Sequence, residues 1–220
     1  MQDCVLPKFG VLTSEQIRQI NENSFLIKYR KGQLIYHQGH PISHVLFLKS
    51  GLVKIFTKYQ QDKSSIIGVV SDNSFFGILS VFDGKLYQNG TSALEDSEVI
   101  HTRLDVFMNV LSENGEYAIC LLRQVCKFGL LIIDKIVKSS YKQVPGKLAE
   151  VLLLFSKEFY KSETFELPMS RQEIADFISA SKETVSRTLS ELKNDRIIEI
   201  NDKIITLKSI DLLERLSKIG

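Results

Sequence analysis

The chain has 220 residues, of which 44% are hydrophobic, and its 28 lysine and arginine residues nearly balance its 26 aspartate and glutamate residues. This length and composition are typical of a globular protein with one large domain or two small ones. The first ten residues lack the apolar stretch of a signal peptide, and the longest apolar runs are too short to span a bilayer, so we expect neither secretion nor membrane insertion.

The N-terminal half predicts a short helix followed by a β-domain. Thr13 and Gln16 have the spacing of a capping box, which predicts a helix from Thr13 to Asn21. From Phe25 to about Leu104, β-rich runs alternate with turn residues at roughly ten-residue spacing, a pattern typical of a β-sandwich or barrel. Strands are expected at residues 33–36, 45–49, 52–57, 65–70 and 99–103.

A long helix is predicted from Glu116 to about Tyr141. Its apolar stripe, with alternating three- and four-residue steps, consists of Ile119, Leu122, Cys126, Gly129, Ile133 and Ile136. Leu121, Leu130, Ile132 and Val137 widen the apolar surface beyond this stripe. We expect the chain's own β-domain to cover one side of the helix and a second copy of the chain to cover the other. A single buried helix in a monomer is the alternative interpretation.

Pro145 and Gly146 are expected to break this helix and to form a hinge before a helical C-terminal part. There the pattern predicts a capping box formed by Ser170 and Glu173, a tight turn at Ser179, and a β-hairpin closed by Asn201 and Asp202. The predicted elements are helices 147–160, 170–179 and 182–194, strands 197–200 and 203–207, and helix 210–216. Two short helices followed by a hairpin indicate a winged helix-turn-helix.

The overall prediction is an α+β protein in three parts. Residues 1–115 form a β-roll sensor domain of the jelly-roll type, residues 116–144 form the dimerisation helix and hinge, and residues 145–220 form a winged helix-turn-helix. The apolar positions expected to hold the last part together are Ile174, Ala175, Phe177, Ile178, Val185, Leu189 and Leu192.

The opposite face of the predicted helix 182–194 carries polar side chains that suit DNA. Arg187 offers a donor fork for guanine, Glu183 accepts from cytosine, and Ser186 lies beside them. The residues expected to meet phosphates or position the protein are Arg171, Ser181, Lys182, Thr184, Lys147 and Lys203. Because the region from Pro145 onward has 12 basic and 13 acidic residues, a net charge of −1, bulk basicity does not support DNA binding. A solvated helix face is the alternative interpretation.

Two runs favour the DNA-binding interpretation. Ser-Arg-Gln-Glu-Ile-Ala-Asp from Ser170 and Ser-Lys-Glu-Thr-Val-Ser-Arg-Thr-Leu from Ser181 resemble the helix-turn-helix of the Crp/Fnr family of bacterial transcription regulators. The glycine-punctuated runs around Gly32, Gly39 and Gly51 are similar to the β-roll of that family. The resemblance implies a cytoplasmic homodimer that binds an inverted-repeat DNA operator in response to a small-molecule effector and that works with RNA polymerase.

Three features of these runs refine the resemblance. Glu183, Ser186 and Arg187 match the Glu-x-x-Ser-Arg pattern of the Fnr branch, whereas Lys182 stands where the Crp branch has arginine. Ser179 stands where the helix-helix turn of the family often has glycine.

The predicted effector region departs from the cyclic-AMP-binding members of the family. Gly77 lies where their phosphate cassette begins, but Ile78 replaces the glutamate that binds the ribose, and Tyr87 and Gln88 replace the arginine and its hydroxyl neighbour. A buried phosphate without a cation is costly, so cyclic AMP is not expected as the effector. An uncharged or apolar ligand is expected in a pocket formed by Gly77, Ile78, Leu79, Tyr87, Gln88, Ile132 and Ile133.

Metal and redox functions find less support in the sequence. The three cysteines Cys4, Cys120 and Cys126 are too few and too scattered for the Fnr iron–sulfur cluster, and such sparse cysteines favour a reduced compartment. Cys126 is expected to be a small apolar contact rather than a redox crosslink.

His37, His40 and His44 are expected to be surface-loop histidines rather than metal or haem ligands. We therefore expect a regulator without catalytic residues, metal or cofactor. The rival interpretation is a metal-dependent jelly-roll (cupin-like) enzyme, or a small-molecule-binding module whose winged helix contacts protein.

Overall fold

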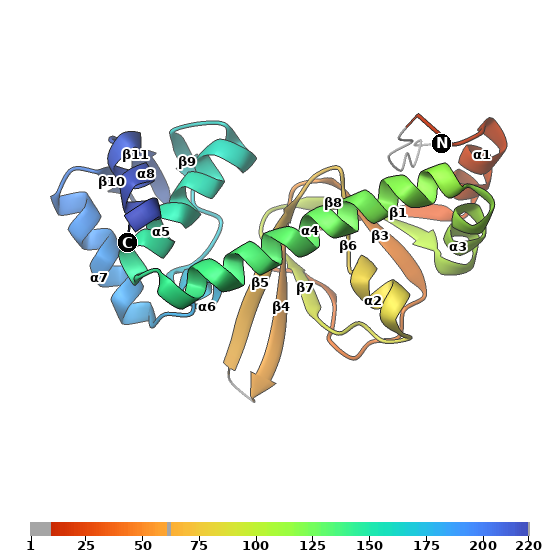
Figure 1. Ribbon diagram of the computed structural model, residues 1–220, viewed down its shortest axis with the longest axis horizontal. Helices are drawn as coiled ribbons and strands as arrows, with labels where there is room; N and C mark the ends of the chain where they lie inside the picture. Colours follow the sequence, from red (N-terminus) through yellow and green to blue (C-terminus); the bar gives the residue numbers. More distant parts are fainter. Residues whose placement is uncertain (1–9, 61–62, 220) are drawn as a thin grey trace. The chain divides into compact units, whose positions relative to one another are not determined.

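The computed structural model describes residues 10–60 and 63–219 and divides the chain into two compact units, Met1–Ile132 and Ile133–Gly220. Figure 1 follows the helices and strands of both units along the chain. The boundary lies within the long helix α4, Gly115–Tyr141, which was predicted from its apolar stripe. The mixed helix and sheet content confirms the expected α+β class.

The first unit contains two antiparallel four-stranded sheets, with strand orders β1-β8-β3-β6 and β2-β7-β4-β5. The strands are β1 Ser24–Tyr29, β2 Leu34–Tyr36, β3 His44–Ser50, β4 Leu52–Gln60, β5 Lys63–Ser71, β6 Ser74–Phe76, β7 Gly90–Ala93 and β8 Ser97–Arg103. All five strands expected from the sequence are present, and β1, β6 and β7 are additional to them. These three were missed because they are short or lack a clear alternation of apolar residues.

Strand β3 is buried on both of its faces, which explains its continuous apolar run. Val45 and Phe47 point into one core cluster, which also contains Phe107 of the helix that follows β8. Leu46 and Leu48 point into a second cluster, which also contains residues of the other sheet. Because neighbouring side chains of a strand point to opposite faces, one strand supplies both cores.

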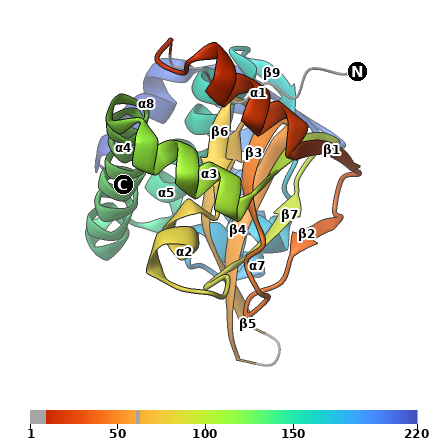
Figure 2. The same ribbon diagram turned by 90° about the vertical axis from the view of Figure 1, so that its right-hand side faces the viewer.

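Helices cover the outer face of the sheet that contains β3 (Figure 2). They are α1 Ser14–Glu22, α2 Ile78–Asp83 and α3 Leu104–Glu113, together with the first part of α4. The capping box predicted for Thr13 and Gln16 is confirmed at the start of α1. Helices α2 and α3 were not predicted, because α2 has only six residues and α3 directly follows a strand.

Helix α4 has one covered side and one exposed side within the described chain. Tyr117, Leu121 and Val125 pack against the first core cluster, and Phe128 packs against the second. Large apolar side chains on the other side are 52–67% exposed, namely Ile119, Leu122, Leu130, Leu131, Ile133, Ile136 and Val137. Of the predicted stripe, Cys126 is also exposed, whereas Gly129 is only half-buried.

The second unit is the helical domain predicted for the C-terminal part, with a small sheet of strand order β10-β11-β9. Its elements after α4 are α5 Val144–Leu154, the π-helix η1 Phe155–Tyr160, β9 Thr164–Glu166, α6 Arg171–Ile178, α7 Lys182–Asn194, β10 Ile198–Asn201, β11 Ile204–Leu207 and α8 Ile210–Ile219. Strand β9 was missed and gives the expected hairpin a third strand. Helix α5 packs against α6, α7 and α8 and forms the centre of the unit.

The helix break predicted at Pro145 and Gly146 lies just before these residues. Helix α4 ends at Tyr141 and α5 already begins at Val144, so both residues lie in the first turn of α5. Proline is tolerated there because the first backbone N–H groups of a helix have no partner within the helix, and its φ already fits. The break between the helices consists of Lys142 and Gln143.

A cluster of ion pairs joins the end of α4 to α5. The carboxylate of Glu150 accepts from Lys138 Nζ at 2.9 Å and from Lys142 Nζ at 3.0 Å, and Asp134 lies 2.5 Å from Lys138. The side chain of Lys142 is only 4% exposed. A buried ammonium depends on its anionic partner, so Glu150 is central to this cluster.

Candidate nucleic-acid interface

The helix-turn-helix begins with a fixed N-terminus at α6. Ser170 Oγ accepts from the backbone N–H of Glu173 at 3.2 Å, and a Glu173 side-chain oxygen accepts from the Ser170 N–H at 2.7 Å. This is the capping box that the sequence predicted, and it satisfies two backbone donors that the helix itself cannot pair.

The turn between α6 and α7 keeps the geometry for which glycine is usual. Ser179 has φ +56° and ψ +53°, in the left-handed region, and the N–H of Ala180 donates to the carbonyl of Ala175 at 3.0 Å. The serine at this family glycine position therefore preserves the turn at a modest conformational cost.

One face of each helix forms the core of the domain. The buried residues are Ile174, Ala175, Ile178, Val185, Leu189 and Leu192, as predicted. Phe177 departs from the prediction because it is only half-buried and lies under the ammonium of Lys135, which is 3.7 Å from the ring centroid. Burial lowers the pKa of Lys135 to about 8.

The start of α7 is held by two of the predicted phosphate-binding residues. Ser181 Oγ accepts from the N–H of Thr184 at 3.1 Å, and the two hydroxyl oxygens lie 2.9 Å apart. The Ser181 side chain thus caps the helix in the free protein, and the Thr184 hydroxyl contacts the capping oxygen. This cap fixes the start of the helix that carries the base-reading residues.

The predicted base-reading residues share one face of α7. Glu183 and Arg187 are exposed and lie one turn apart, while Ser186 beside them is half-buried. Arg187 is 71% exposed, and its Nε lies 3.8 Å from the carboxylate of Glu191. The structure therefore brings Glu183, Ser186 and Arg187 together at the surface.

The remaining predicted positioning residues differ in their surroundings. Lys182 is exposed at the start of α7, and Lys203 is exposed in the turn between β10 and β11, the hairpin that forms the wing. Arg171 is half-buried, and burial lowers the pKa of its guanidinium from the usual value. Lys147 is also half-buried and donates to Ser139 Oγ at 3.4 Å.

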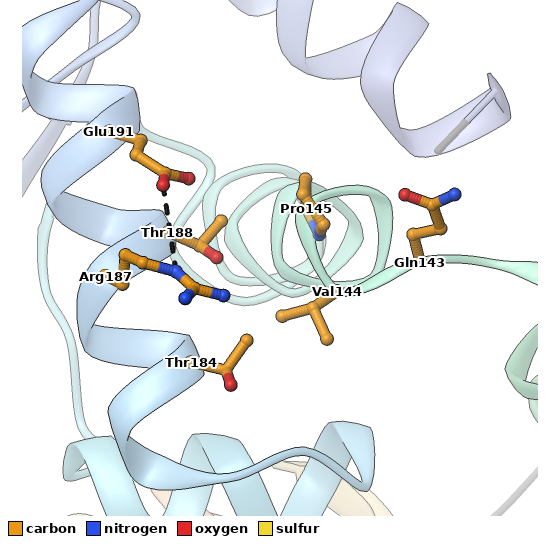
Figure 3. Close-up of a pocket in the computed structure, with 7 residues that line it drawn as sticks. All are labelled: Gln143, Val144, Pro145, Thr184, Arg187, Thr188 and Glu191. Carbon is orange, nitrogen blue, oxygen red and sulfur yellow. Dashed lines mark ion pairs between the residues drawn. The ribbon is translucent and has the colours of Figure 1, made fainter.

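A shallow hollow of about 610 Å³ lies between α7 and the start of α5 (Figure 3). It is lined by Gln143, Val144, Pro145, Thr184, Arg187, Thr188 and Glu191. Apart from Arg187 and Thr184, these residues were not among the predicted site residues. The four-residue spacing from Arg187 is a sequence signal for Glu191 alone among them.

The residues predicted for the effector pocket lie in different surroundings in the structure. Ile78 belongs to the core cluster under the helices, and Tyr87 belongs to the cluster between the sheets. Leu79 and Gln88 are exposed, as is Ile133, while Ile132 is half-buried. Sequence neighbours at a strand-to-helix turn point in different directions, which a linear pattern does not show.

Two tyrosine rings occupy the position beside Gly77. Tyr36 and Tyr87 stack with centroids 3.8 Å apart, and Tyr87 Oη donates to the His44 carbonyl at 3.1 Å. Gly77 has φ +68°, and a Cβ on it would lie 2.8 Å from Tyr36 Oη. Both phenols are protonated at physiological pH even at the usual pKa of 10, and burial raises the pKa further, to about 12 for Tyr36.

Of the three histidines predicted for surface loops, His37 and His40 are exposed and lie outside the strands, whereas His44 is half-buried and begins β3. His44 lies in β3, and its ring packs with the rings of Phe25 and His101. His101 Nε2 in turn forms a hydrogen bond of 3.1 Å with Tyr29 Oη. His37 and His40 remain near each other, with centroids 6.3 Å apart. Prediction placed His44 in a loop because the strand was expected to begin one residue later.

Among the described residues, no group of three or more histidine, cysteine or acidic side chains is arranged to hold a metal ion. Cys120 is half-buried and Cys126 exposed, and both are free thiols, whereas Cys4 lies outside the described residues. The jelly-roll metalloenzyme alternative therefore gains no support from the described side chains. In the same part of the chain, no helix is long and apolar enough to cross a membrane.

Family models match both units of the chain. The cyclic nucleotide-binding domain model matches residues 26–114, and the Crp-like helix-turn-helix domain model matches residues 146–216. The chain belongs to the Crp/Fnr family of transcription regulators. Transcription regulation and DNA binding are thus family properties that agree with the exposed face of α7.

Curated Crp/Fnr relatives match most of the chain. The global nitrogen regulator of Nostoc sp. is 26% identical over 193 residues, which are 85% of this chain and 86% of that protein. The cAMP-activated global transcriptional regulator CRP of Salmonella typhimurium is 23% identical over 184 residues, covering 82% of this chain and 88% of that protein. These relatives are transcription regulators, which favours a regulator over an enzyme.

Solved structures of the family share the fold. FixK2 from Bradyrhizobium japonicum has a TM-score of 0.81 at 22% identity and covers 90% of this chain and 98% of its own. A transcriptional regulator of the CRP/FNR family from Thermus thermophilus has a TM-score of 0.75 at 17% identity and covers 88% of this chain and 98% of its own. At these identities the similarity supports the architecture of β-roll, long helix and helix-turn-helix.

Proposed function

We propose that the protein is a homodimeric transcription regulator that binds an inverted-repeat operator through α7, in response to a ligand other than cyclic AMP. The observation that carries this proposal is the polar face of α7, where exposed Glu183 and Arg187 lie one turn apart on a helix whose other face is buried. Two such helices related by a two-fold axis would meet half-sites with centres about 34 Å apart.

Arginine and glutamate at these positions suit direct reading of a G·C pair. The fork of Arg187 fits O6 and N7 of guanine, and Glu183 accepts from N4 of a cytosine. Lys182 and Lys203 are exposed cations at the ends of this surface, where contact with phosphates fixes the register of the helix. Only the contacting face has to be positive, so the near-neutral charge of the C-terminal part does not oppose binding.

Replacing Arg187 with alanine is expected to remove the preference for guanine at one base pair, at a cost of about 1–3 kcal/mol. Lys182→Ala is expected to weaken binding to all sequences alike and to lower the salt slope, because a phosphate contact carries no sequence information. Selection from randomised sites with the wild type and both variants tests this. If wild type and Arg187→Ala return the same motif, Arg187 does not read the guanine.

The signal is proposed to be something other than a cyclic nucleotide. Ile78 is buried among apolar side chains and provides no carboxylate, and the space beside Gly77 is occupied by the rings of Tyr36 and Tyr87. A phosphate placed there would have to displace a stacked aromatic pair and would meet neutral phenols. An effector must bind one state of the protein better than another, so a ligand that cannot enter cannot act.

Cyclic AMP is accordingly expected neither to bind tightly nor to change the affinity for DNA. Isothermal titration calorimetry should detect no binding with a dissociation constant at or below roughly ten micromolar. A fluorescence anisotropy titration of operator DNA should give the same curve with and without the nucleotide. Tight binding, or a shift of the curve, would overturn this part of the proposal.

A further inference from the structure

Glu191 is the acidic partner of the proposed base-reading arginine. It lies one turn after Arg187 on α7, and its Oε1 is 3.8 Å from Arg187 Nε. Both side chains line the hollow between α7 and α5. The contact is made within a single helix and therefore depends on the four-residue spacing alone.

The carboxylate faces only one edge of the guanidinium. The dashed line in Figure 3 joins Glu191 to Nε, while the two terminal nitrogens of Arg187 point away from Glu191. Those terminal nitrogens carry the paired donors that a guanine requires at O6 and N7. The ion pair thus leaves the base-reading end of the side chain free.

Without Glu191 the guanidinium would have more freedom. Arg187 is 71% exposed, and it lines the hollow of about 610 Å³ rather than packing against other side chains in the core. An arginine that is held before binding loses less conformational entropy when it meets a base. It also has less opportunity to turn toward a phosphate, a contact that does not discriminate between sequences.

We infer that Glu191 is a positioning residue for DNA recognition, which holds Arg187 at Nε so that its terminal nitrogens meet guanine. The inference rests on the proposed function, because it assigns to Glu191 a role in the specificity of the same site. The negative charge of Glu191 also disfavours phosphate contacts near Arg187. Both effects raise the preference for the correct base over other sequences.

Glu191→Ala is expected to lower the ratio of specific to non-specific affinity by roughly fivefold, the upper range for an exposed ion pair. Non-specific affinity should rise at the same time, since a carboxylate facing the DNA has been removed. Glu191→Asp keeps the charge but draws the carboxylate away from Nε, where the contact is an ion pair at 3.8 Å, and should therefore lose part of the guanine preference. A purely repulsive Glu191 would instead leave the aspartate variant with the wild-type ratio.

The test is a binding titration of the full-length protein against its selected operator, the same operator with the guanine replaced, and an unrelated duplex. Glu158→Gln, an exposed position on η1, is the control for the change in charge and should leave the ratio unchanged. In the Arg187→Ala background, Glu191→Ala should have no further effect on the guanine preference.

Failure of the role of Glu191 and failure of the proposed function give different results. If Arg187→Ala loses the guanine preference while Glu191→Ala keeps the wild-type ratio, the role of Glu191 is overturned and the proposed function stands. If the wild type shows no preferred duplex, or if Arg187→Ala has the same guanine preference as the wild type, the proposed reading of DNA is overturned. The role of Glu191 is then overturned with it.

Discussion

Replacing Ile133 with aspartate is expected to convert the proposed dimer into a monomer. Ile133 is 58% exposed in the single chain, in the middle of a row of apolar side chains on α4. In a symmetric helix pair, the substitution would bury two unpaired carboxylates near each other. An uncompensated buried charge costs about 3–5 kcal/mol, so the dissociation constant should rise by at least roughly a hundredfold.

Analytical ultracentrifugation of wild type and variant at micromolar concentration measures this effect. Leu212→Asp is the matched control, because Leu212 is another exposed apolar residue, 44% exposed, on α8 of the same unit. The control should sediment like the wild type. A dimeric Ile133→Asp variant would mean that the interface lies elsewhere or that the chain does not dimerise through α4.

The architecture followed from the sequence where the pattern of apolar residues was long and regular. The stripe on α4 predicted a helix with two apolar sides, and its own β-domain does cover the side of Tyr117 and Leu121. The capping boxes at Thr13 and Ser170 predicted helix starts correctly, because each consists of a local pair of side chains. Such signals need no knowledge of the tertiary structure.

Other features depend on contacts between distant residues. Pro145 suggested a break, yet a proline in the first turn fits a helix as well as a hinge does, and packing of α5 on α8 decides the matter. The apolar residues Ile78 and Tyr87 suggested one pocket, but they belong to different cores on the two sides of a sheet. The face of the sheet on which a side chain is buried is set by strand pairing, and the spacing of residues along the sequence does not reveal that pairing.

The exposed face of α7 was likewise predictable from local sequence signals, whereas the hollow beside it depends on tertiary contacts. The residue types at positions 183, 186 and 187 were found by motif, and α7 does present Glu183 and Arg187 to solvent. The sequence does not predict the hollow beside them, because its lining includes Gln143 just before α5 and Val144 and Pro145 in α5, far from α7 in the sequence. Its discovery required the packing of α5 against α7.

The second large effect is expected at Glu150. This carboxylate receives Lys142 Nζ at 3.0 Å and Lys138 Nζ at 2.9 Å, and the Lys142 side chain is only 4% exposed. Glu150→Ala would leave the Lys142 ammonium buried without this partner, whereas the more exposed Lys138 keeps Asp134. We expect the free energy of unfolding of the second unit to fall by about 3 kcal/mol, at the lower end of the cost of breaking a buried ion pair, because Lys142 is buried while the Glu150 side chain is 39% exposed.

Hydrogen exchange read by mass spectrometry measures this change within the intact chain. Amides of α5 should lose roughly a hundredfold in protection where exchange requires the unit to open, while amides of β3 and β8 in the other unit serve as an unchanged reference. Because apolar replacement of both partners removes the unpaired charge, the double variant Glu150→Leu/Lys142→Met should regain most of the protection. Full protection in Glu150→Ala alone would show that Lys142 reaches water or another acceptor, and that Glu150 does not stabilise the junction of α4 with α5.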